Sequence, residues 1–252
     1  MVTPTSRRGN GKVLAVIPSR LESTRLPRKP LIDIAGKPMI QWVYERASQA
    51  KLIDRLIVAT DSEEICTAVS SFGGEAMITS PDHQSGTDRL VEVATEIADY
   101  DVVLNVQGDE PLLDPKTLDV LIEGFLQSNR APMGTLVKRA ANESEIIDSN
   151  SPKVVLSAMG DALYFSRSPI PYNRDDAPGV EFFIHIGVYI YDRPFLLEYP
   201  NLGHSKLEKA ERLEQLRALE FGHKISVFET ESSSIGVDTP ADLERVRKLL
   251  SN

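Results

Sequence analysis

VLAVIPSRLESTRLPRKPL, residues 13–31, joins an apolar run to a basic loop. The run 13–18 is continuous and ends in proline, which is typical of a strand buried on both faces. The loop that follows carries four cations, although the 252-residue chain has a formal net charge of -9: Arg20, Arg25, Arg28 and Lys29. Arginine binds phosphate oxygens in pairs and lysine adds a point charge. The segment therefore predicts a phosphate site held by local charge.

A mobile, solvated loop is the alternative interpretation of these cations. Pro27 and Pro30 favour the binding site, because they restrict the loop and reduce the entropy lost on gripping a ligand. The loop does not have the G-x-x-x-x-G-K-[ST] pattern of a Walker loop.

Strands and helices alternate over the first 110 residues. Further buried strands are predicted at 54–60, 75–79 and 102–107, and helices at 37–50, 62–72 and 85–98. This alternation predicts a parallel sheet with helices on both faces, in which ligands bind at the carboxyl ends of the strands. The basic loop and the segment GDEP, 108–111, both occupy such ends. We expect them to meet in space.

The pattern changes after Pro132. Strands are predicted at 133–139, 153–158, 162–165 and 182–192, with few helices between them and many aromatic residues. They indicate a smaller antiparallel insertion over the sheet. Residues 205–222 are predicted to form one helix whose apolar residues recur every three positions, so that it needs partners on more than one side. A strand at 224–230 and a final helix capped by Thr239 complete the chain.

Acidic residues stand at two of the predicted element ends. Asp109 follows the strand 102–107, and Asp238 precedes the final helix. Carboxylates at a strand tip are ligands that Mg²⁺ prefers. Each acid alone has a simpler interpretation, as a turn residue or a helix cap, although Thr239 is the better cap by spacing. With the basic loop, the two acids suggest a metal–nucleotide site.

Other polar residues are weaker candidates. His83, Gln84 and Ser85 precede a predicted helix N-terminus, where backbone N–H groups bind anions, although a surface turn is the alternative. The aromatic region contains four residues that can either clamp a carboxylate or form surface ion pairs: Arg167, Arg174, His185 and Tyr189. Glu214 and Gln215 lie on the predicted helix 205–222, where solvent exposure is the simpler interpretation.

Composition excludes several classes of protein. No apolar run reaches the ~18 residues of a membrane span. The acidic balance argues against general nucleic-acid binding. A single cysteine, Cys66, excludes an internal disulfide and indicates a reducing compartment, so we expect a cytoplasmic protein. Residues 1–12 are predicted to be a disordered extension, and 13–252 a single domain.

The chain resembles one family along nearly its whole length. The blocks IPSRLESTRLPRKPL, GKPMIQ, VATD, DHQSGTDRL, NVQGDEP, YFSRSPIPY, HIGVYIY, LEQLR and GVDTPADLERVR occur in the order seen in the CMP-KDO synthetases, the 3-deoxy-manno-octulosonate cytidylyltransferases. The resemblance implies a Rossmann-like, glycosyltransferase-A-like α/β nucleotidyltransferase with a mixed, mostly parallel sheet. It implies a sugar-binding and dimerisation subregion at about 132–222, and a homodimer.

The resemblance also implies the reaction CTP plus KDO giving CMP-KDO and pyrophosphate, with Mg²⁺, for lipopolysaccharide biosynthesis. Arg20, Lys29, Asp109 and Asp238 would be catalytic, with the two aspartates as metal ligands. Nucleotide binding would fall to Pro18, Ser19, Arg20, Lys29, Gln84, Ser85 and Gly86. The sugar acid would be held by Arg167, Arg174, His185, Tyr189, Glu214 and Gln215.

Two positions depart from the family pattern. Arg28 stands where the family usually has glycine in LPGKP, which would change the loop backbone or add a phosphate contact, and Ser19 replaces the usual alanine. Two other functions stay open on the sequence: a cytidylyltransferase for 8-amino-KDO or another sialic-type acidic sugar, and a nucleotide-binding regulator without chemistry. Retention of Lys29, Asp109 and Asp238 argues against the regulator.

Overall fold

The computed structural model describes residues 11–22, 26–128, 131–203, 205–232 and 235–251. The predicted extension, residues 1–12, falls mainly outside this part of the chain, as does Arg25 of the basic loop. No described helix is long and apolar enough to cross a membrane.

The predicted parallel strands form one half of a central sheet. β1 (Val13–Ser19) pairs in parallel with β4 (Arg55–Thr60) on one side and with β6 (Val102–Asn105) on the other, and β5 (Ala76–Ile78) adds to β4. The strands are nearly continuous apolar runs because helices cover both faces. The fold class predicted from the alternation is confirmed in this half.

The second half of the sheet is antiparallel where it meets the first. β10 (Phe183–Asp192) pairs antiparallel with both β6 and β7 (Met133–Arg139), and β11 (Ile225–Glu229) pairs in parallel with β7. These strands continue the central sheet edge to edge, so the prediction that they lie over it is wrong. Among the described strands, β8 (Lys153–Leu156) and β9 (Ala162–Ser166) branch off from this order, because β8 pairs with the first residues of β10 and β9 pairs with β8. A separate two-stranded antiparallel sheet joins β2 (Asp33–Ile34) to β3 (Lys37–Pro38).

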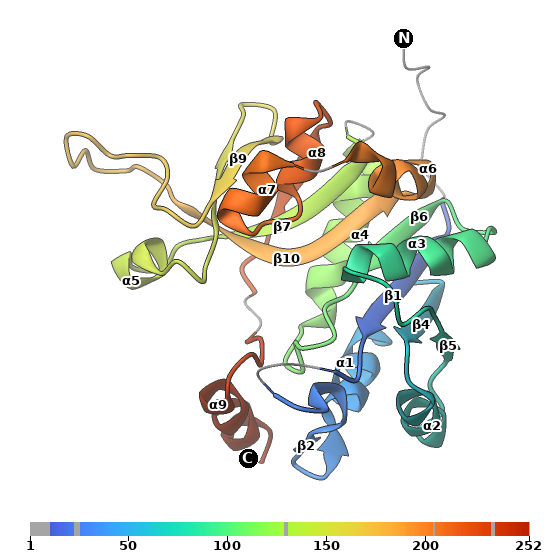
Figure 1. Cartoon of the computed structure of the whole chain (residues 1–252). Coiled ribbons are helices and arrows are strands. Elements are labelled where there is room, and N and C mark those ends of the chain that lie inside the picture. Colours follow the sequence, from blue (N-terminus) through green and yellow to red (C-terminus); the bar gives the residue numbers. More distant parts are fainter. Residues whose placement is uncertain (1–10, 23–25, 129–130, 204, 233–234, 252) are drawn as a thin grey trace.

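Helices cover the two faces of the sheet (Figure 1). Alternate β1 side chains point to different cores: Val13, Ala15 and Ile17 to one, Leu14 and Val16 to the other. The first core packs α1 (Met39–Ala47), α2 (Glu63–Ser71) and α4 (Pro115–Ser128). The second packs α3 (Gly86–Glu96), α6 (Arg193–Glu198) and α8 (Leu216–Glu220). The remaining helices are α5 (Glu143–Ile147), α7 (Lys206–Glu211), α9 (Pro240–Leu250) and the short 3₁₀ turns η1 (Lys29–Leu31) and η2 (Tyr199–Leu202).

Two helical regions differ from the sequence analysis. No helix was predicted over 115–128, where α4 buries Leu118, Leu121 and Phe125 at helical spacing. The single helix predicted over 205–222 is wrong, because Arg212 takes a left-handed backbone, with φ of 53°, between α7 and α8. The apolar row that winds around one straight helix cannot all reach one core, and the break lets Leu213 be buried there.

Candidate active site

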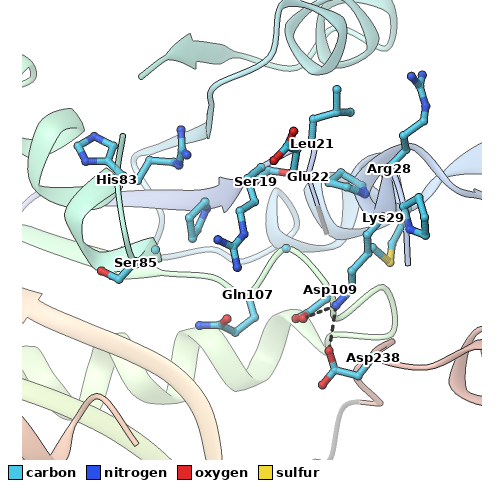
Figure 2. Close-up of a pocket in the computed structure, with 18 of the residues that line it drawn as sticks. Ser19, Leu21, Glu22, Arg28, Lys29, His83, Ser85, Gln107, Asp109 and Asp238 are labelled. Carbon is cyan, nitrogen blue, oxygen red and sulfur yellow. Dashed lines mark hydrogen bonds and ion pairs between the residues drawn. The ribbon is translucent and has the colours of Figure 1, made fainter. Parts of the chain in front are cut away.

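A cavity of about 740 Å³ opens at the carboxyl ends of β1 and β6. It is where the sequence predicts ligands to bind, and Figure 2 shows side chains from distant segments converging on it. Its lining comes from the ends of those strands, the basic loop, the N-terminal parts of α1 and α3 and the segment before α9: Pro18, Ser19, Arg20, Leu21, Glu22, Pro27, Arg28, Lys29, Pro30, Met39, His83, Gln84, Ser85, Gly86, Arg89, Gln107, Gly108, Asp109 and Asp238.

The basic loop turns sharply at Arg28, which lies immediately before η1. Its φ of 56° is left-handed, a conformation that glycine adopts without cost and that other residues adopt with strain. The Arg28 guanidinium pairs with Glu64 of α2. The backbone of this loop therefore follows a glycine-like path although a bulky residue is present, and the added side chain already has an anionic partner.

Lys29 brings together the two acids that the sequence predicts to meet. Its Nζ lies 2.7 Å from Asp109 Oδ2 and 3.1 Å from Asp238 Oδ1, as the dashed lines in Figure 2 show. The backbone adds a second link, because the N–H of Val237 donates to the Asp109 carbonyl at 2.9 Å. The expected convergence of residues 109 and 238 on the basic loop is confirmed. Their predicted role as metal ligands stays a prediction.

The carboxylates of Asp109 and Asp238 supply two of the oxygen ligands that a hard divalent cation needs. Two carboxylates already share one cationic nitrogen, so a single position lies within reach of both. The described residues contain no group of three or more acidic, histidine or cysteine side chains able to hold a metal. Mg²⁺ suits such a site because it keeps several waters and takes phosphate oxygens as ligands.

Gly108 explains how the strand ends come so close. A Cβ at this position would lie 3.0 Å from the carbonyl oxygen of Pro18. Only glycine lets the chain after β6 pass against the end of β1 without displacing it. Asp109, the next residue, therefore lies in the cavity lining.

The N-terminus of α3 forms another wall. Ser85 accepts a hydrogen bond from the Asp88 N–H at 3.1 Å, and the Asp88 carboxylate accepts one from the Ser85 N–H at 3.0 Å, which is the predicted capping box. His83 pairs with Glu92 of the same helix. Gln84, Ser85 and Gly86 line the cavity, and the nucleotide-binding role that the resemblance implies for them stays a prediction.

Arg89 is a functional candidate that the sequence analysis missed. It is only 4% exposed, lines the cavity and pairs with Asp61 at 3.0 Å. The other oxygen of Asp61 accepts from the Leu21 N–H at 3.3 Å, at the start of the basic loop. Arg89 thus ties α3 to the loop. Its signal was the pair of blocks VATD and DHQSGTDRL, which contain both partners.

A second cavity, of about 110 Å³, adjoins the first and shares Pro18, Gly86 and Gln107 with it. Its remaining lining comes from α3, β6, β10, η2 and the α7–α8 break: Thr87, Asn105, Tyr189, Tyr191, Tyr199, Glu214 and Gln215. Three buried atoms of this lining have no hydrogen-bond partner among the described residues: Asn105 Oδ1, Glu214 Oε1 and Gln215 Nε2. Burial raises the pKa of the Glu214 carboxyl. Buried polar atoms left unpaired are costly, so a polar molecule bound in this cavity would offset that cost.

The six predicted sugar-binding residues divide into two groups. Tyr189, Glu214 and Gln215 line the second cavity. Arg167, Arg174 and His185 are not among the lining residues of either cavity. His185 is buried behind Tyr189, with its Nε2 3.0 Å from Thr135 Oγ1, and burial lowers its pKa to about 3. Arg174 is exposed between β9 and β10, and the Arg167 guanidinium donates to backbone carbonyls.

Comparison with known proteins shows which family the chain belongs to. The cytidylyltransferase family model matches residues 14–225. A 3-deoxy-manno-octulosonate cytidylyltransferase of Solibacter usitatus is 50% identical over 94% of both chains. That of Geobacter sulfurreducens is 48% identical over 94% of this chain and 99% of its own length.

A solved structure of CMP:2-keto-3-deoxy-manno-octonic acid synthetase complexed with CTP superposes with a TM-score of 0.91 at 46% identity, covering 95% of this chain and 98% of that one. A 4-diphosphocytidyl-2C-methyl-D-erythritol synthase from Anaerococcus prevotii, at 15% identity and a TM-score of 0.66, shares the fold. The chain therefore belongs to the cytidylyltransferase family, and within it to the 3-deoxy-manno-octulosonate cytidylyltransferases.

Proposed function

We propose that the protein transfers CMP from CTP to 3-deoxy-manno-octulosonate (KDO), giving CMP-KDO and pyrophosphate. The observation that carries this proposal is the sharing of Pro18, Gly86 and Gln107 between two cavities of different character. One is large, open and lined by cations. The other is small, and its lining includes buried polar atoms that find no partner in the part of the chain that the structure describes. A nucleotide in the first and an acidic sugar in the second would meet at these shared residues.

The large cavity suits the triphosphate of CTP. Arg20 and Lys29 face it from the basic loop, and the first turn of α3 adds backbone N–H groups at the positive end of the helix dipole. The anomeric hydroxyl of KDO would attack the α-phosphorus in line, with pyrophosphate leaving. The work of the protein is then to hold two anions together and to neutralise the charge that develops on the leaving group.

Asp109 and Asp238 would hold Mg²⁺, as two carboxylates that can reach one cation. When bound, Mg²⁺ would offset phosphate charge and lower the pKa of the attacking hydroxyl. Lys29 would then release the two carboxylates and turn to phosphate, since its ammonium cannot keep the same position as a second cation. The lysine supplies a positive charge in either arrangement.

The small cavity suits the hydroxyl groups of KDO. Asn105 Oδ1 and Glu214 Oε1 can accept hydrogen bonds, and Gln215 Nε2 can donate one. Each is buried and has no partner within the described part of the chain, so a sugar that supplies the missing bonds gains their full strength, whereas an apolar molecule leaves them unmet.

CMP-KDO is the activated form of a sugar acid, and we infer a role in lipopolysaccharide biosynthesis. We also infer a cytoplasmic location and a homodimer from membership of the family. Light scattering coupled to gel filtration measures the second of these directly. A monomer of 27.9 kDa at working concentration would contradict the dimer.

Pyrophosphate release from CTP, KDO and Mg²⁺ tests the proposed function. We expect turnover only with all three present, and at most slow turnover when 8-amino-KDO or a sialic acid replaces KDO. Faster turnover with either sugar would change the substrate. Absence of pyrophosphate with every sugar, while CTP still binds, would make the protein a nucleotide-binding regulator instead.

A further inference from the structure

One side chain of α3 joins the carboxyl ends of three neighbouring strands. β1, β4 and β5 lie side by side in the sheet (Figure 1). Arg89 extends from α3 to residues that directly follow two of them. Its Nη2 donates to Asp61 Oδ2 at 3.0 Å, after β4, and its Nη1 donates to Thr79 Oγ1, after β5. The Asp61 carboxylate then reaches the segment after β1, because its Oδ1 accepts a hydrogen bond from the Leu21 N–H at 3.3 Å.

The bond to Leu21 lies just beyond the point at which β1 and β4 separate. Their last paired residues are Ser19 and Thr60. Arg20 comes between Ser19 and Leu21, is exposed and lines the large cavity. A long exposed side chain can reach many positions, so the backbone on either side of it decides which of them are available. The sheet fixes that backbone at Ser19, and Asp61 fixes it at Leu21.

The surroundings of Arg89 require a carboxylate at position 61. Arg89 is 4% exposed, and a buried cation is costly unless it is paired. The Thr79 hydroxyl, which accepts from Arg89, donates in turn to the Thr60 carbonyl at 3.1 Å and so holds the guanidinium from a second side. A carboxylate offers two accepting oxygens, one for Arg89 and one for the loop, whereas an amide offers one. An aspartate therefore satisfies both neighbours at once.

We propose that Arg89 and Asp61 form a positioning pair, which fixes the start of the basic loop and thereby sets where Arg20 meets the triphosphate. The inference rests on the proposed function, since it assigns the large cavity to CTP. Arg89 lines this cavity, but its guanidinium bonds Asp61 and Thr79, so it acts on the nucleotide through the loop and not as a phosphate ligand. A loop that is fixed before the ligand arrives loses less entropy on binding, so the pair contributes to CTP affinity.

The change Asp61→Asn tests the pair, because the competing explanation predicts the opposite sign. Asparagine keeps the shape of the side chain, but its one accepting oxygen can serve Arg89 or the Leu21 N–H and not both. If the pair positions the loop, the Kd for CTP with Mg²⁺, measured by isothermal titration calorimetry, rises about tenfold or more. If Arg89 is itself a phosphate ligand, loss of the Asp61 charge frees its guanidinium, and the Kd stays the same or falls. An unchanged or lower Kd would overturn the proposal.

Arg20→Gln shows whether the pair acts through Arg20. In that background, Asp61→Asn should raise the Kd for CTP less than about twofold further, because no arginine is left to be positioned. Effects that multiply would mean that the pair acts on the nucleotide independently of Arg20, and would contradict the proposal. Arg89→Met should weaken CTP binding as Asp61→Asn does, and Arg89→Lys, which keeps a positive charge beside Asp61, should recover part of the loss.

Asp54→Asn is the matched control at the opposite ends of the same two strands. Asp54 precedes β4 as Asp61 follows it, and its Oδ2 accepts a hydrogen bond from the Val13 N–H at 2.7 Å, where β1 begins. The change removes the same charge from a carboxylate that also anchors β1, but at the end remote from the cavity, so the Kd for CTP should stay within about twofold. An equal rise in Asp54→Asn and Asp61→Asn would show a general effect of charge or stability, and would overturn the proposal.

Steady-state kinetics separate positioning from a merely structural role. In Asp61→Asn the KM for CTP should rise with the Kd, while the KM for KDO stays within about twofold, because the small cavity keeps its lining. Equal increases in both KM values would contradict the proposal. If Asp61→Asn does not fold, as judged by circular dichroism, Arg89→Lys takes its place in the comparison with Arg20→Gln. A wild-type protein that binds CTP but does not turn over KDO would overturn the proposed function, and the calorimetric test of the pair would remain decisive.

Discussion

The two cavities are formed by different kinds of structural element, and each is lined by a different kind of polar group. The large cavity lies at the ends of parallel strands, and its cations and acids follow those strands directly along the chain. The small cavity depends on β10, which runs antiparallel, and on a helix break held by Tyr199 and Arg167. Charge dominates the first, and buried hydrogen-bonding atoms dominate the second. Substitutions in the two should therefore differ in what they change.

Asp109→Asn should have the largest effect of the changes considered, and the effect should fall on kcat. The change removes one of two carboxylates beside Lys29 while keeping the side-chain shape, so we expect kcat to fall about a thousandfold with Mg²⁺ present. Pyrophosphate release at saturating CTP and KDO measures it. The control is Asp99→Asn, which changes an exposed acid just before the amino end of β6, whereas Asp109 follows its carboxyl end. Wild-type turnover in Asp109→Asn would remove Asp109 from the metal site.

Gln215→Leu, in the small cavity, should weaken KDO binding while making the folded protein more stable. Gln215 is 2% exposed and its Nε2 has no partner among the described residues, so leucine removes an unmet donor. We expect the KM for KDO to rise about tenfold to a hundredfold, and the free energy of unfolding to increase by ~1 kcal/mol.

Urea unfolding and steady-state kinetics measure the two effects of Gln215→Leu. Gln127→Leu, on the exposed side of α4, is the control for a change of amide to leucine. If Gln215→Leu loses both stability and KDO binding, the Gln215 side chain stabilises the fold and is not an unpaired donor reserved for a ligand.

The large cavity was predicted in most of its parts because local sequence determines it. Apolar runs identify buried strands, and parallel strands bring their carboxyl ends to one edge. The meeting of Lys29 with Asp109 and Asp238 follows from that geometry together with the position of Thr239 as a cap. The sequence also shows that Arg28 stands where the family usually has glycine, although it leaves open whether this residue changes the loop backbone. The structure shows a left-handed residue there, paired with Glu64.

The small cavity was predicted only through the family resemblance, and then in part. Nothing local in the sequence indicates that the helix over 205–222 breaks at Arg212, because the break depends on carbonyls bonded by Arg167, more than 40 residues away. The sequence likewise gives no sign of the contacts of Arg167 with the backbone and of His185 with Thr135, and the assignment of both residues to a ligand stays a prediction. Contacts between distant segments are not encoded in periodicity or spacing.

His185, which lies next to Tyr189 of the small cavity, should make the stability of the protein depend on pH. Its pKa is about 3 in the folded protein against an ordinary 6.5, because burial disfavours the charged ring. Below pH 6.5 the unfolded chain takes up a proton that the folded chain does not. This contribution to stability is therefore complete above pH 6.5 and is lost as pH falls, at about 1.4 kcal/mol per pH unit.

His185→Gln should remove this dependence. Between pH 7 and pH 5, we expect the wild type to lose roughly 2 kcal/mol more of its unfolding free energy than the variant does. Urea titrations at the two pH values measure the difference, and His223→Gln is the control. Equal losses in wild type and His185→Gln would mean that His185 is protonated in the folded state within this range.

Substitutions of Arg28 should have the smallest effect. They test backbone strain in the basic loop and leave the acidic residues of the large cavity unchanged. Arg28→Gly and Arg28→Ala both remove the exposed ion pair with Glu64, so that pair cancels when the two variants are compared. With φ at 56°, alanine keeps the cost of a Cβ in a left-handed conformation and glycine does not. The glycine variant should be more stable than the alanine variant by ~1 kcal/mol in urea unfolding. The KM for CTP should be similar in both.

If the alanine variant is as stable as the glycine variant, the loop does not hold residue 28 in the left-handed region. If both variants raise the KM for CTP about tenfold, the Arg28 guanidinium leaves Glu64 for phosphate when nucleotide binds.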